Sequence, residues 1–282
     1  MEEFIHEEFI DQEFKFSEVY RYIDKYKNYQ IREPLPLGQN ETVILNRTIW
    51  IYWKQGLDSA PKIVRKCYKS ICSNKPDDFS IVLLTDENLN SYVQLPDYIW
   101  AKYNQGYITV THLSDIIRLE LLSMYGGCWI DATVFCSSTI PRYMMSGDMF
   151  FFKLASVMCN PVLKLSSWWI YAEQSNRMIH LTRQMLYEYW KKENEIRSYF
   201  LLHIMMSKII DEDPLSRGIF YNIPYFNSGN AHVLQGKLGV EYDRNEWEII
   251  QNISPVHKLT YKKRYLQGDV YNYYMAMLAD KL

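Results

Sequence analysis

A continuous run of apolar residues limits the folds that this chain can adopt. Residues Phe79–Thr85 (FSIVLLT) form a continuous apolar run, which is typical of a strand covered on both faces within a parallel sheet. Arg47–Trp53 (RTIWIYW) has the composition of a strand, and Pro61–Cys72 has the apolar spacing of a helix. This succession, continued by the elements below, predicts a doubly wound α/β domain with ligands at the carboxyl ends of its strands.

The same patterns divide the rest of the chain. Residues 1–30 have helical periodicity, and Pro34–Gly38 (PLPLG) breaks it, so we expect an N-terminal helical extension over 1–40 and one domain over 41–282. Further predicted elements are a helix near Pro96–Tyr103, a short strand at Tyr107–Val110, a mostly helical insertion at about 161–215 with helices at Asn176–Lys192 and Tyr199–Ile210, and a tail of short strands and loops ending in a helix at Tyr271–Leu282.

Charge and cysteine content exclude some classes of protein. The 31 basic and 33 acidic residues are mixed along the chain, so it lacks the basic stripe that a nucleic-acid-binding protein needs. The cysteines are odd in number and form no C-x-x-C pair, which favours reduced thiols in a cytosolic protein. They are Cys67, Cys72, Cys128, Cys136 and Cys159.

No targeting or membrane-spanning segment is expected. The first residues, MEEFIHEEFIDQEFKF, are acidic where a signal peptide is basic, and they contain no apolar core. No stretch approaches the roughly 18 apolar residues of a transmembrane helix. We therefore expect a soluble cytoplasmic protein. Peripheral association with the inner face of the membrane stays open.

The chemistry is concentrated in residues 112–135, HLSDIIRLELLSMYGGCWIDATVF. Ser114 is a natural N-cap, and Gly126 and Gly127 end the helix that follows it. Asp115 and Arg118 would then share one face near the positive end of the helix dipole. An acceptor and a forked donor at this place suit an anionic, hydroxyl-rich ligand.

A strand is predicted after the glycines, over Cys128–Phe135. Alternation places Trp129, Asp131 and Thr133 on one face, opposite an apolar set. A carboxylate and a hydroxyl at adjacent positions on one face could hold a hard divalent cation against a diphosphate. Alternatively, Asp115 and Arg118 form a structural ion pair and Asp131 caps a strand end, although a lone carboxylate in an apolar strand is costly unless it is paired.

The order of these motifs resembles the nucleotide-sugar site of family 32 glycosyltransferases. Trp129–Val134 (WIDATV) is similar to their capsular polysaccharide synthesis group, in which threonine replaces the second aspartate of the Asp-x-Asp motif. Tyr52 and Trp53 in WIYW resemble the strand that lines the uracil pocket, and Val256–Lys262 (VHKLTYK) resembles the C-terminal motif. The resemblance covers roughly residues 47–265.

The resemblance implies a fold, a reaction and a cofactor. The fold is GT-A, a Rossmann-like α/β domain with a mostly parallel central sheet flanked by helices. The reaction is retaining transfer of a sugar from a UDP-sugar to a saccharide acceptor, free or lipid-linked, in the synthesis of capsule or exopolysaccharide. The cofactor is Mn²⁺ or Mg²⁺. Because Thr133 is a weaker metal ligand than aspartate, dependence on the metal is expected to be reduced, and metal independence is left open.

The resemblance also implies a role for each site residue. Asp131, Thr133 and His257 would hold the metal, and Asp115 and Arg118 would contact the ribose and sugar. Trp129, Lys258 and Lys262 join Tyr52 and Trp53 in binding the nucleotide sugar. Asp131, Arg118 and His257 would stabilise the charge that develops on the leaving diphosphate.

Other interpretations stay open at this point. A metal-dependent phosphohydrolase would also use Asp131, but it would require more carboxylates and histidines at metal-ligand spacing. A non-catalytic nucleotide- or sugar-binding module would explain the aromatic content, since 16% of residues are aromatic. Trp168, Trp169 and Tyr171 could stack on an acceptor or belong to the core. No nucleophile is assigned, with Glu173, Glu195, Asp211 and Asp243 as candidates by type alone.

Overall fold

A five-stranded sheet forms the centre of the protein. The computed structural model describes residues 14–31, 46–154, 162–174 and 176–262. In the sheet, β1 pairs in parallel with β2 and β3, whereas β6 runs antiparallel to both β3 and β5, so four strands share one direction. The order is β2-β1-β3-β6-β5, with bounds β1 Thr48–Tyr52, β2 Ser80–Leu84, β3 Gly127–Ile130, β5 Met149–Lys153 and β6 Leu165–Ala172.

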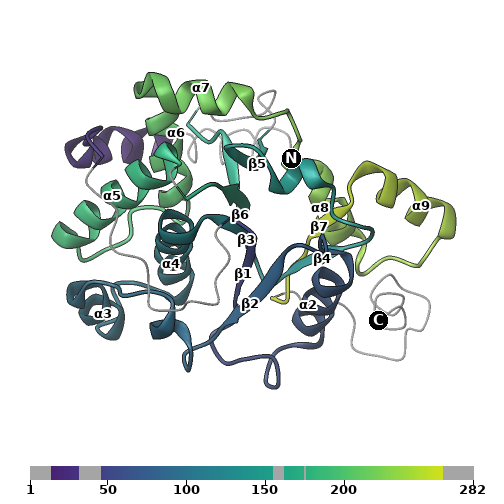
Figure 1. The fold of residues 1–282 in the computed structure, drawn as a ribbon. Coiled ribbons are helices and arrows are strands. Elements are labelled where there is room, and N and C mark those ends of the chain that lie inside the picture. Colours follow the sequence, from purple (N-terminus) through teal and green to yellow (C-terminus); the bar gives the residue numbers. More distant parts are fainter. Residues whose placement is uncertain (1–13, 32–45, 155–161, 175, 263–282) are drawn as a thin grey trace.

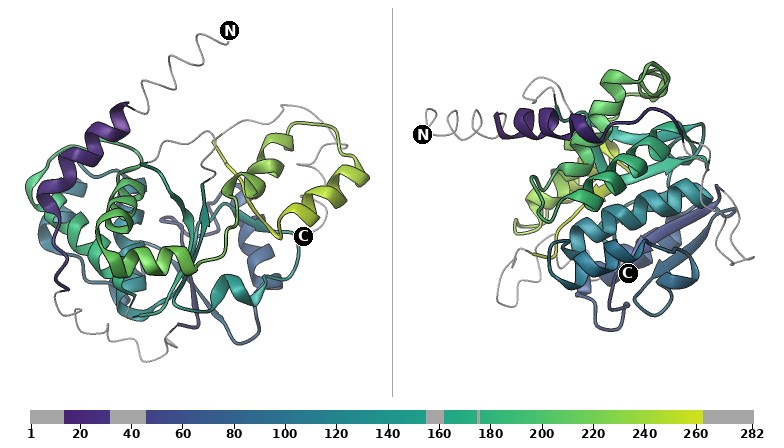
Figure 2. Two further views of the ribbon diagram at one scale, coloured as in Figure 1. Left: turned by 90° about the horizontal axis from the view of Figure 1, so that it is seen from above. Right: turned by 90° about the vertical axis from the view of Figure 1, so that its left-hand side faces the viewer.

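Helices cover both faces of this sheet (Figures 1 and 2). Helices α3 to α6 lie on one side, and α2, α8 and α9 lie on the other. Their bounds are α2 Lys62–Asn74, α3 Asp97–Asn104, α4 Val110–Tyr125, α5 Arg177–Lys192, α6 Leu201–Glu212, α7 Pro214–Asn222, α8 Ser228–Lys237 and α9 Arg244–Ile253, with 3₁₀ turns at η1 Ile23–Tyr26, η2 Leu89–Ser91 and η3 Arg142–Met145. The α/β class with a mostly parallel central sheet flanked by helices is thereby confirmed.

A second, two-stranded sheet joins distant parts of the chain. Strand β4 (Val134–Cys136) pairs antiparallel with β7 (Val256–Lys258). The register sets Val134 opposite Lys258 and Phe135 opposite His257. This pairing brings the C-terminal motif beside the segment that follows the paired glycines.

The paired glycines are required by a close approach of backbone. Gly126 ends α4 with a φ of 65°, and Gly127 begins β3 with a φ of 93°, both in the region that favours glycine. A Cβ on Gly127 would lie 2.3 Å from the carbonyl oxygen of Thr48 in β1. Trp50 completes the junction, because its indole N–H donates to the Gly126 carbonyl at 2.9 Å. The glycines therefore seat β3 directly against β1.

Several sequence expectations for elements are wrong. Tyr107–Val110 is not a strand, because Thr109 caps α4 and Val110 is its first residue. The strand expected at Cys128–Phe135 is interrupted, since residues 131–133 form a turn in which the Val134 N–H donates to the Asp131 carbonyl at 3.0 Å. The stretch 161–215 contains the two expected helices as α5 and α6, but it also contains β6, a full strand of the central sheet that was not predicted.

Between residue 216 and β7 the chain is also more helical than expected. Helices α8 and α9 occupy most of it up to β7. The predicted helix at Tyr271–Leu282 and the break at Pro34–Gly38 lie outside the described residues. The division between an extension over 1–40 and a domain over 41–282 stays a prediction. Among the described helices, none combines the length and the apolar character needed to cross a bilayer.

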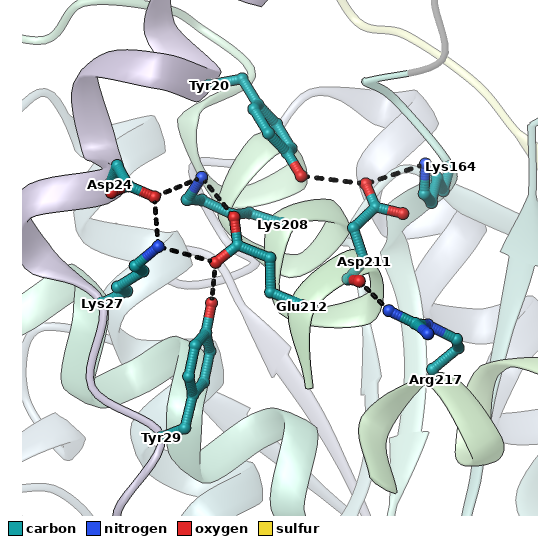
Figure 3. A network of polar contacts seen from close by, with 9 residues as sticks. All are labelled: Tyr20, Asp24, Lys27, Tyr29, Lys164, Lys208, Asp211, Glu212 and Arg217. Atoms are coloured by element: carbon teal, nitrogen blue, oxygen red, sulfur yellow. Dashed lines mark hydrogen bonds and ion pairs between the residues drawn. The ribbon is translucent and has the colours of Figure 1, made fainter. Parts of the chain in front are cut away.

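The described part of the N-terminal segment packs on the domain through polar contacts (Figure 3). Residues 14–22 are α-helical and run into η1. Nine residues form what we call the N-terminal network: Tyr20, Asp24, Lys27, Tyr29, Lys164, Lys208, Asp211, Glu212 and Arg217. At its centre the Lys208 ammonium lies 2.9 Å from Asp24 and 2.7 Å from Glu212, which ties η1 to α6.

Candidate functional site

A cavity of about 620 Å³ opens where β1 and β3 end. Since both are parallel strands, this is the edge at which an α/β sheet binds its ligands. The chain after β7 and the first turns of α4 complete the walls. The lining residues are Tyr52, Trp53, Lys54, Gln55, Val110, Thr111, Ser114, Trp129, Asp131, Ala132, Thr133, Tyr199, His232, Gln235, Lys258, Leu259, Thr260, Tyr261 and Lys262.

Asp131 lies at the centre of the polar contacts in this cavity. Its Oδ1 accepts from the indole N–H of Trp129 at 2.9 Å and from Nη2 of Arg118 at 3.2 Å. Its Oδ2 lies 3.3 Å from the Lys258 ammonium. Burial by itself would raise the pKa of Asp131, but Lys258, Arg118 and Trp129 outweigh it and hold that pKa below its ordinary value. The carboxylate is therefore ionised and oriented by three donors.

Asp115 and Arg118 lie behind the cavity wall rather than in it. Arg118 is 3% exposed, and its guanidinium lies 4.8 Å from the centre of the Trp129 ring and 3.0 Å from Asp115. Burial raises the pKa of Asp115 to about 6 despite the arginine. Neither residue is part of the lining, so the expected direct contact with ribose and sugar is not seen. Arg118 instead fixes Asp131.

The helix start also differs from the expectation. The N-cap of α4 is Thr109, whose side chain accepts from the His112 N–H, and Ser114 lies inside the helix. Asp115 and Arg118 are consequently in the second and third turns. At that distance from the terminus the helix dipole contributes little, so the predicted dipole effect on this pair is wrong.

The two neighbouring residues of β7 point in opposite directions. Lys258 reaches into the cavity, where its ammonium donates to Oγ1 of Thr133 as well as contacting Asp131. His257 is fully buried, its Nε2 is 2.9 Å from Oγ of Ser137, and its ring stacks on Phe135. Burial lowers the pKa of His257 to about 4. The expected catalytic and metal-binding role of His257 is therefore not supported by its position.

Aromatic side chains form the entrance to the cavity. Trp53 and Tyr261 meet edge to face with ring centres 5.2 Å apart. Tyr52 is buried, and its hydroxyl has no hydrogen-bond partner among the residues that the structure describes. Tyr199, just before α6, is 58% exposed and covers another side. Flat faces and an unsatisfied hydroxyl are suitable for a base or a sugar.

The structure adds residues that the sequence does not single out. Tyr199, His232 and Gln235 line the cavity from α8 and from the loop before α6, and no local pattern marks them. Trp168, Trp169 and Tyr171 belong to the core, being at most 6% exposed. The four carboxylates considered as nucleophiles are outside the lining: Glu173, Glu195, Asp211 and Asp243.

The divalent cation implied by the resemblance does not match this donor set. Of its three expected ligands, His257 is turned into the core, and Asp131 and Thr133 already contact the Lys258 ammonium. Nowhere in the described ranges do three or more His, Cys, Asp or Glu side chains gather as a metal site. Mn²⁺ and Mg²⁺ need several oxygen ligands from protein, substrate or water, and the protein offers two that are already paired with a cation.

Comparison with known proteins defines the family. The chain matches the model of the capsular polysaccharide synthesis protein family over residues 4–277, and it belongs to that family. It is 27% identical to glycosyltransferase afumC of Aspergillus fumigatus over an alignment of 93 residues. This alignment covers 30% of the present chain and 24% of afumC. It is 28% identical over 107 residues to O-glycosyltransferase braB of Annulohypoxylon truncatum, covering 35% and 25%. The matches thus span about a quarter of these curated relatives.

Solved structures with some similarity are also glycosyltransferases. The PaToxG glycosyltransferase has a TM-score of 0.39 at 12% identity, covering 75% of this chain and 86% of that one. The apo form of glycosyltransferase GlyE from Streptococcus pneumoniae has a TM-score of 0.44 at 12% identity, covering 83% and 59%.

Proposed function

We propose that this protein is a glycosyltransferase that moves a sugar from a nucleoside diphosphate, UDP by preference, to a saccharide acceptor. Retention of the anomeric configuration, a relationship to family 32 and a role in capsule or exopolysaccharide synthesis are parts of the proposal. One observation carries it: the cavity at the strand ends combines aromatic walls with the oriented Asp131–Lys258 pair. Family membership and the named relatives support the same class of activity.

The aromatic entrance suits the nucleoside. Trp53 and Tyr261 offer ring faces and edges on which uracil can stack, and such stacking contributes about 1–3 kcal/mol per base. The Tyr52 hydroxyl supplies a buried polar group that gains a hydrogen bond when a base or ribose fills the cavity. The nucleoside would thereby lie over the end of β1.

Two lysines suit the diphosphate. Lys258, the last residue of β7, and Lys262, four residues later, both line the cavity. In the reaction, the bond between the sugar anomeric carbon and the diphosphate oxygen breaks, and its electron pair stays on that oxygen. The ammonium of Lys258 would stabilise this developing charge, which is the main catalytic task when a nucleoside diphosphate departs.

Asp131 would orient the Lys258 ammonium and bind the donor sugar. Its Oδ2 holds Lys258, and its exposed edge can accept a hydrogen bond from a hydroxyl group of the donor sugar. Arg118 and Trp129 fix the carboxylate from behind through Oδ1. Asp115 and Arg118 are thus positioning residues.

Ligand-induced stabilisation separates the competing functions. The melting temperature is measured with UDP, GDP, CMP and TDP, with free sugars, and with each nucleotide plus Mn²⁺. Stabilisation by one nucleoside diphosphate supports the transferase, whereas stabilisation by free sugars alone would indicate a sugar-binding module. A panel of UDP-sugars with saccharide acceptors then tests transfer, and NMR of the product reports the anomeric configuration. Phosphate release without an acceptor would instead indicate a phosphohydrolase.

The remaining expectations stay predictions. They are a lipid-linked acceptor, a cytoplasmic location and association with the inner face of a membrane. Addition of a lipid-linked acceptor to the transfer assay, in detergent micelles, tests the first of them.

A further inference from the structure

We propose that the Lys258 ammonium is the built-in cation of the donor site, so that the donor diphosphate binds this protein without Mn²⁺ or Mg²⁺. The inference rests on the proposed function and specifies how that site binds its substrate. It starts from the disagreement between the metal that the sequence motif implies and the contacts that the motif residues make.

The position of Lys258 is that of a bridging cation. Its Nζ contacts the carboxylate of Asp131 at 3.3 Å and also donates to the hydroxyl of Thr133. These are the two side chains that would bind the metal if the turn after β3 worked as an Asp-x-Asp motif. An ammonium carries three donors. With two directed at Asp131 and Thr133, the third can reach a phosphate oxygen in the cavity.

The charges around Asp131 also disfavour a second cation. Arg118 contacts Oδ1 and Lys258 contacts Oδ2, so a dication would have to approach a carboxylate that two positive groups already neutralise. Asp115 lies outside the cavity lining, and its carboxylate already pairs with Arg118 at 3.0 Å, so it does not serve as a ligand for the dication. A diphosphate, in contrast, is attracted to the same place, since it brings negative charge to Lys258 and Lys262.

The register of β7 is what places a lysine here. Pairing with β4 puts Lys258 opposite Val134 and sends His257 to the buried face, against Phe135 and Ser137. The neutral imidazole is thereby kept out of the cavity, and the charged side chain takes its place. Thr133 fits this arrangement better than aspartate would, because a hydroxyl accepts from the ammonium without adding negative charge beside the diphosphate.

The direct test needs no variant. Binding of UDP to the full chain is measured by calorimetry in EDTA and again in MnCl₂. We expect dissociation constants that agree within about twofold. We also expect the EPR signal of free Mn²⁺ to be no lower with protein and UDP than with UDP alone, because UDP itself binds part of the Mn²⁺ in solution. Binding of UDP that requires Mn²⁺ would overturn the inference while leaving the proposed function intact. If none of UDP, GDP, CDP and TDP binds under either condition, the proposed function fails together with the inference.

Two variants test the lysine itself. Lys258→Met should weaken UDP binding in EDTA by about 10- to 100-fold, the loss of a charge-assisted hydrogen bond. Lys258→Arg should recover most of it. The matched control is Lys191→Met, an exposed lysine at the end of α5, for which we expect unchanged affinity. Unchanged affinity in Lys258→Met would contradict the inference.

A double variant should convert the site into one that binds UDP through a divalent metal ion. Thr133→Asp combined with Lys258→Met supplies two carboxylates and removes the ammonium. We expect UDP binding that is weak in EDTA, is restored by MnCl₂, and is accompanied by loss of the free Mn²⁺ EPR signal. Binding of Mn²⁺ in Thr133→Asp alone, with Lys258 intact, would show that the lysine does not exclude the metal and would count against the inference.

Discussion

Two polar networks in this protein each surround a cation that is almost fully buried. In the N-terminal network the side chain of Lys208 is 3% exposed and pairs with Asp24 and Glu212 (Figure 3). The second network, which we call the cavity network, consists of Asp115, Arg118, Trp129, Asp131, Thr133 and Lys258. Its Arg118 side chain is likewise 3% exposed and pairs with Asp115 and Asp131. Burial and pairing alone therefore do not separate a structural network from a functional one.

The networks differ in what they leave unsatisfied. Around the cavity, several buried polar atoms have no hydrogen-bond partner among the described residues, including the Tyr52 hydroxyl, Arg118 Nε and His203 Nδ1. No such atom occurs in the nine residues of the N-terminal network as described. Of these three residues Tyr52 alone lines the cavity, so its hydroxyl is the unpaired atom that a ligand can reach, whereas the N-terminal network holds its segment in place.

Loss of Asp131 should have the largest effect. Asp131→Ala removes the group that orients Lys258, and we expect the transfer rate to fall by about 1,000-fold, or about 4 kcal/mol, while the fold survives. The control is Asp211→Ala in the N-terminal network, which should leave transfer unchanged. Rates are measured with the donor identified by the UDP-sugar panel, and circular dichroism checks the fold. Normal turnover in folded Asp131→Ala would remove this residue from the site.

Between pH 7.5 and pH 4.5, acid should lower the free energy of unfolding through the buried histidines of the domain rather than through the N-terminal network. The five described histidines all have lowered pKa values, mainly through burial: His112, His180, His203, His232 and His257. None of the nine residues of the N-terminal network is a histidine, and the pKa values of Asp24 and Glu212 are held below their ordinary values.

A histidine with a lowered pKa contributes stability that is complete above its unfolded pKa near 6.5 and is lost as the pH falls toward the folded value. For His257, with a pKa of about 4, the loss by pH 4.5 is about 2.5 kcal/mol. Guanidinium unfolding at pH 7.5 and at pH 4.5 measures this loss as a difference between two free energies of unfolding. In His257→Phe we expect that difference to be smaller by about 2.5 kcal/mol. An equal pH dependence in the variant would show that His257 is not the titrating group.

Lys208→Met should destabilise the protein without changing ligand binding. It leaves Asp24 and Glu212 without their buried partner, although both are partly exposed and still contact Lys27, so we expect a loss of about 2 kcal/mol. Lys27→Met, at a lysine side chain that is 37% exposed, should cost less than about 1 kcal/mol. Chemical unfolding and UDP calorimetry are compared. A weaker affinity for UDP in Lys208→Met would mean that the two networks are coupled.

Much of the fold could be predicted because its signals are local. Strand β1 follows from its composition, strand β2 from a continuous apolar run, and the helices α2, α5 and α6 from apolar spacing. Strand β6 could not be predicted, since Ser166 and Ser167 interrupt its apolar run and the strand directly precedes a long helix. The turn at residues 131–133 was missed because it depends on the pairing of β4 with β7, and the paired residues Phe135 and His257 are 122 residues apart along the chain.

Prediction of the candidate site from sequence also fails where the outcome depends on strand pairing, here for a single residue. The motif identifies Asp131, Thr133 and the segment around residue 257, and the structure brings these together. Which of His257 and Lys258 faces the cavity is decided by strand register, because a shift of one residue exchanges the two faces. The contributions of Tyr199 and His232 depend on tertiary packing and have no local signal.

The smallest expected effects come from a matched pair of tyrosines, one in the N-terminal network and one in the cavity lining. The Tyr20 hydroxyl donates to Asp211 at 3.1 Å, so Tyr20→Phe should cost about 1 kcal/mol of stability and leave UDP affinity unchanged. The Tyr52 hydroxyl is buried without a partner among the described residues, so Tyr52→Phe should change stability by less than about 0.5 kcal/mol and weaken UDP binding by about three- to tenfold. Unfolding curves and calorimetry on both variants would reveal the opposite pattern if the unsatisfied hydroxyl were a packing defect rather than a contact kept for the ligand.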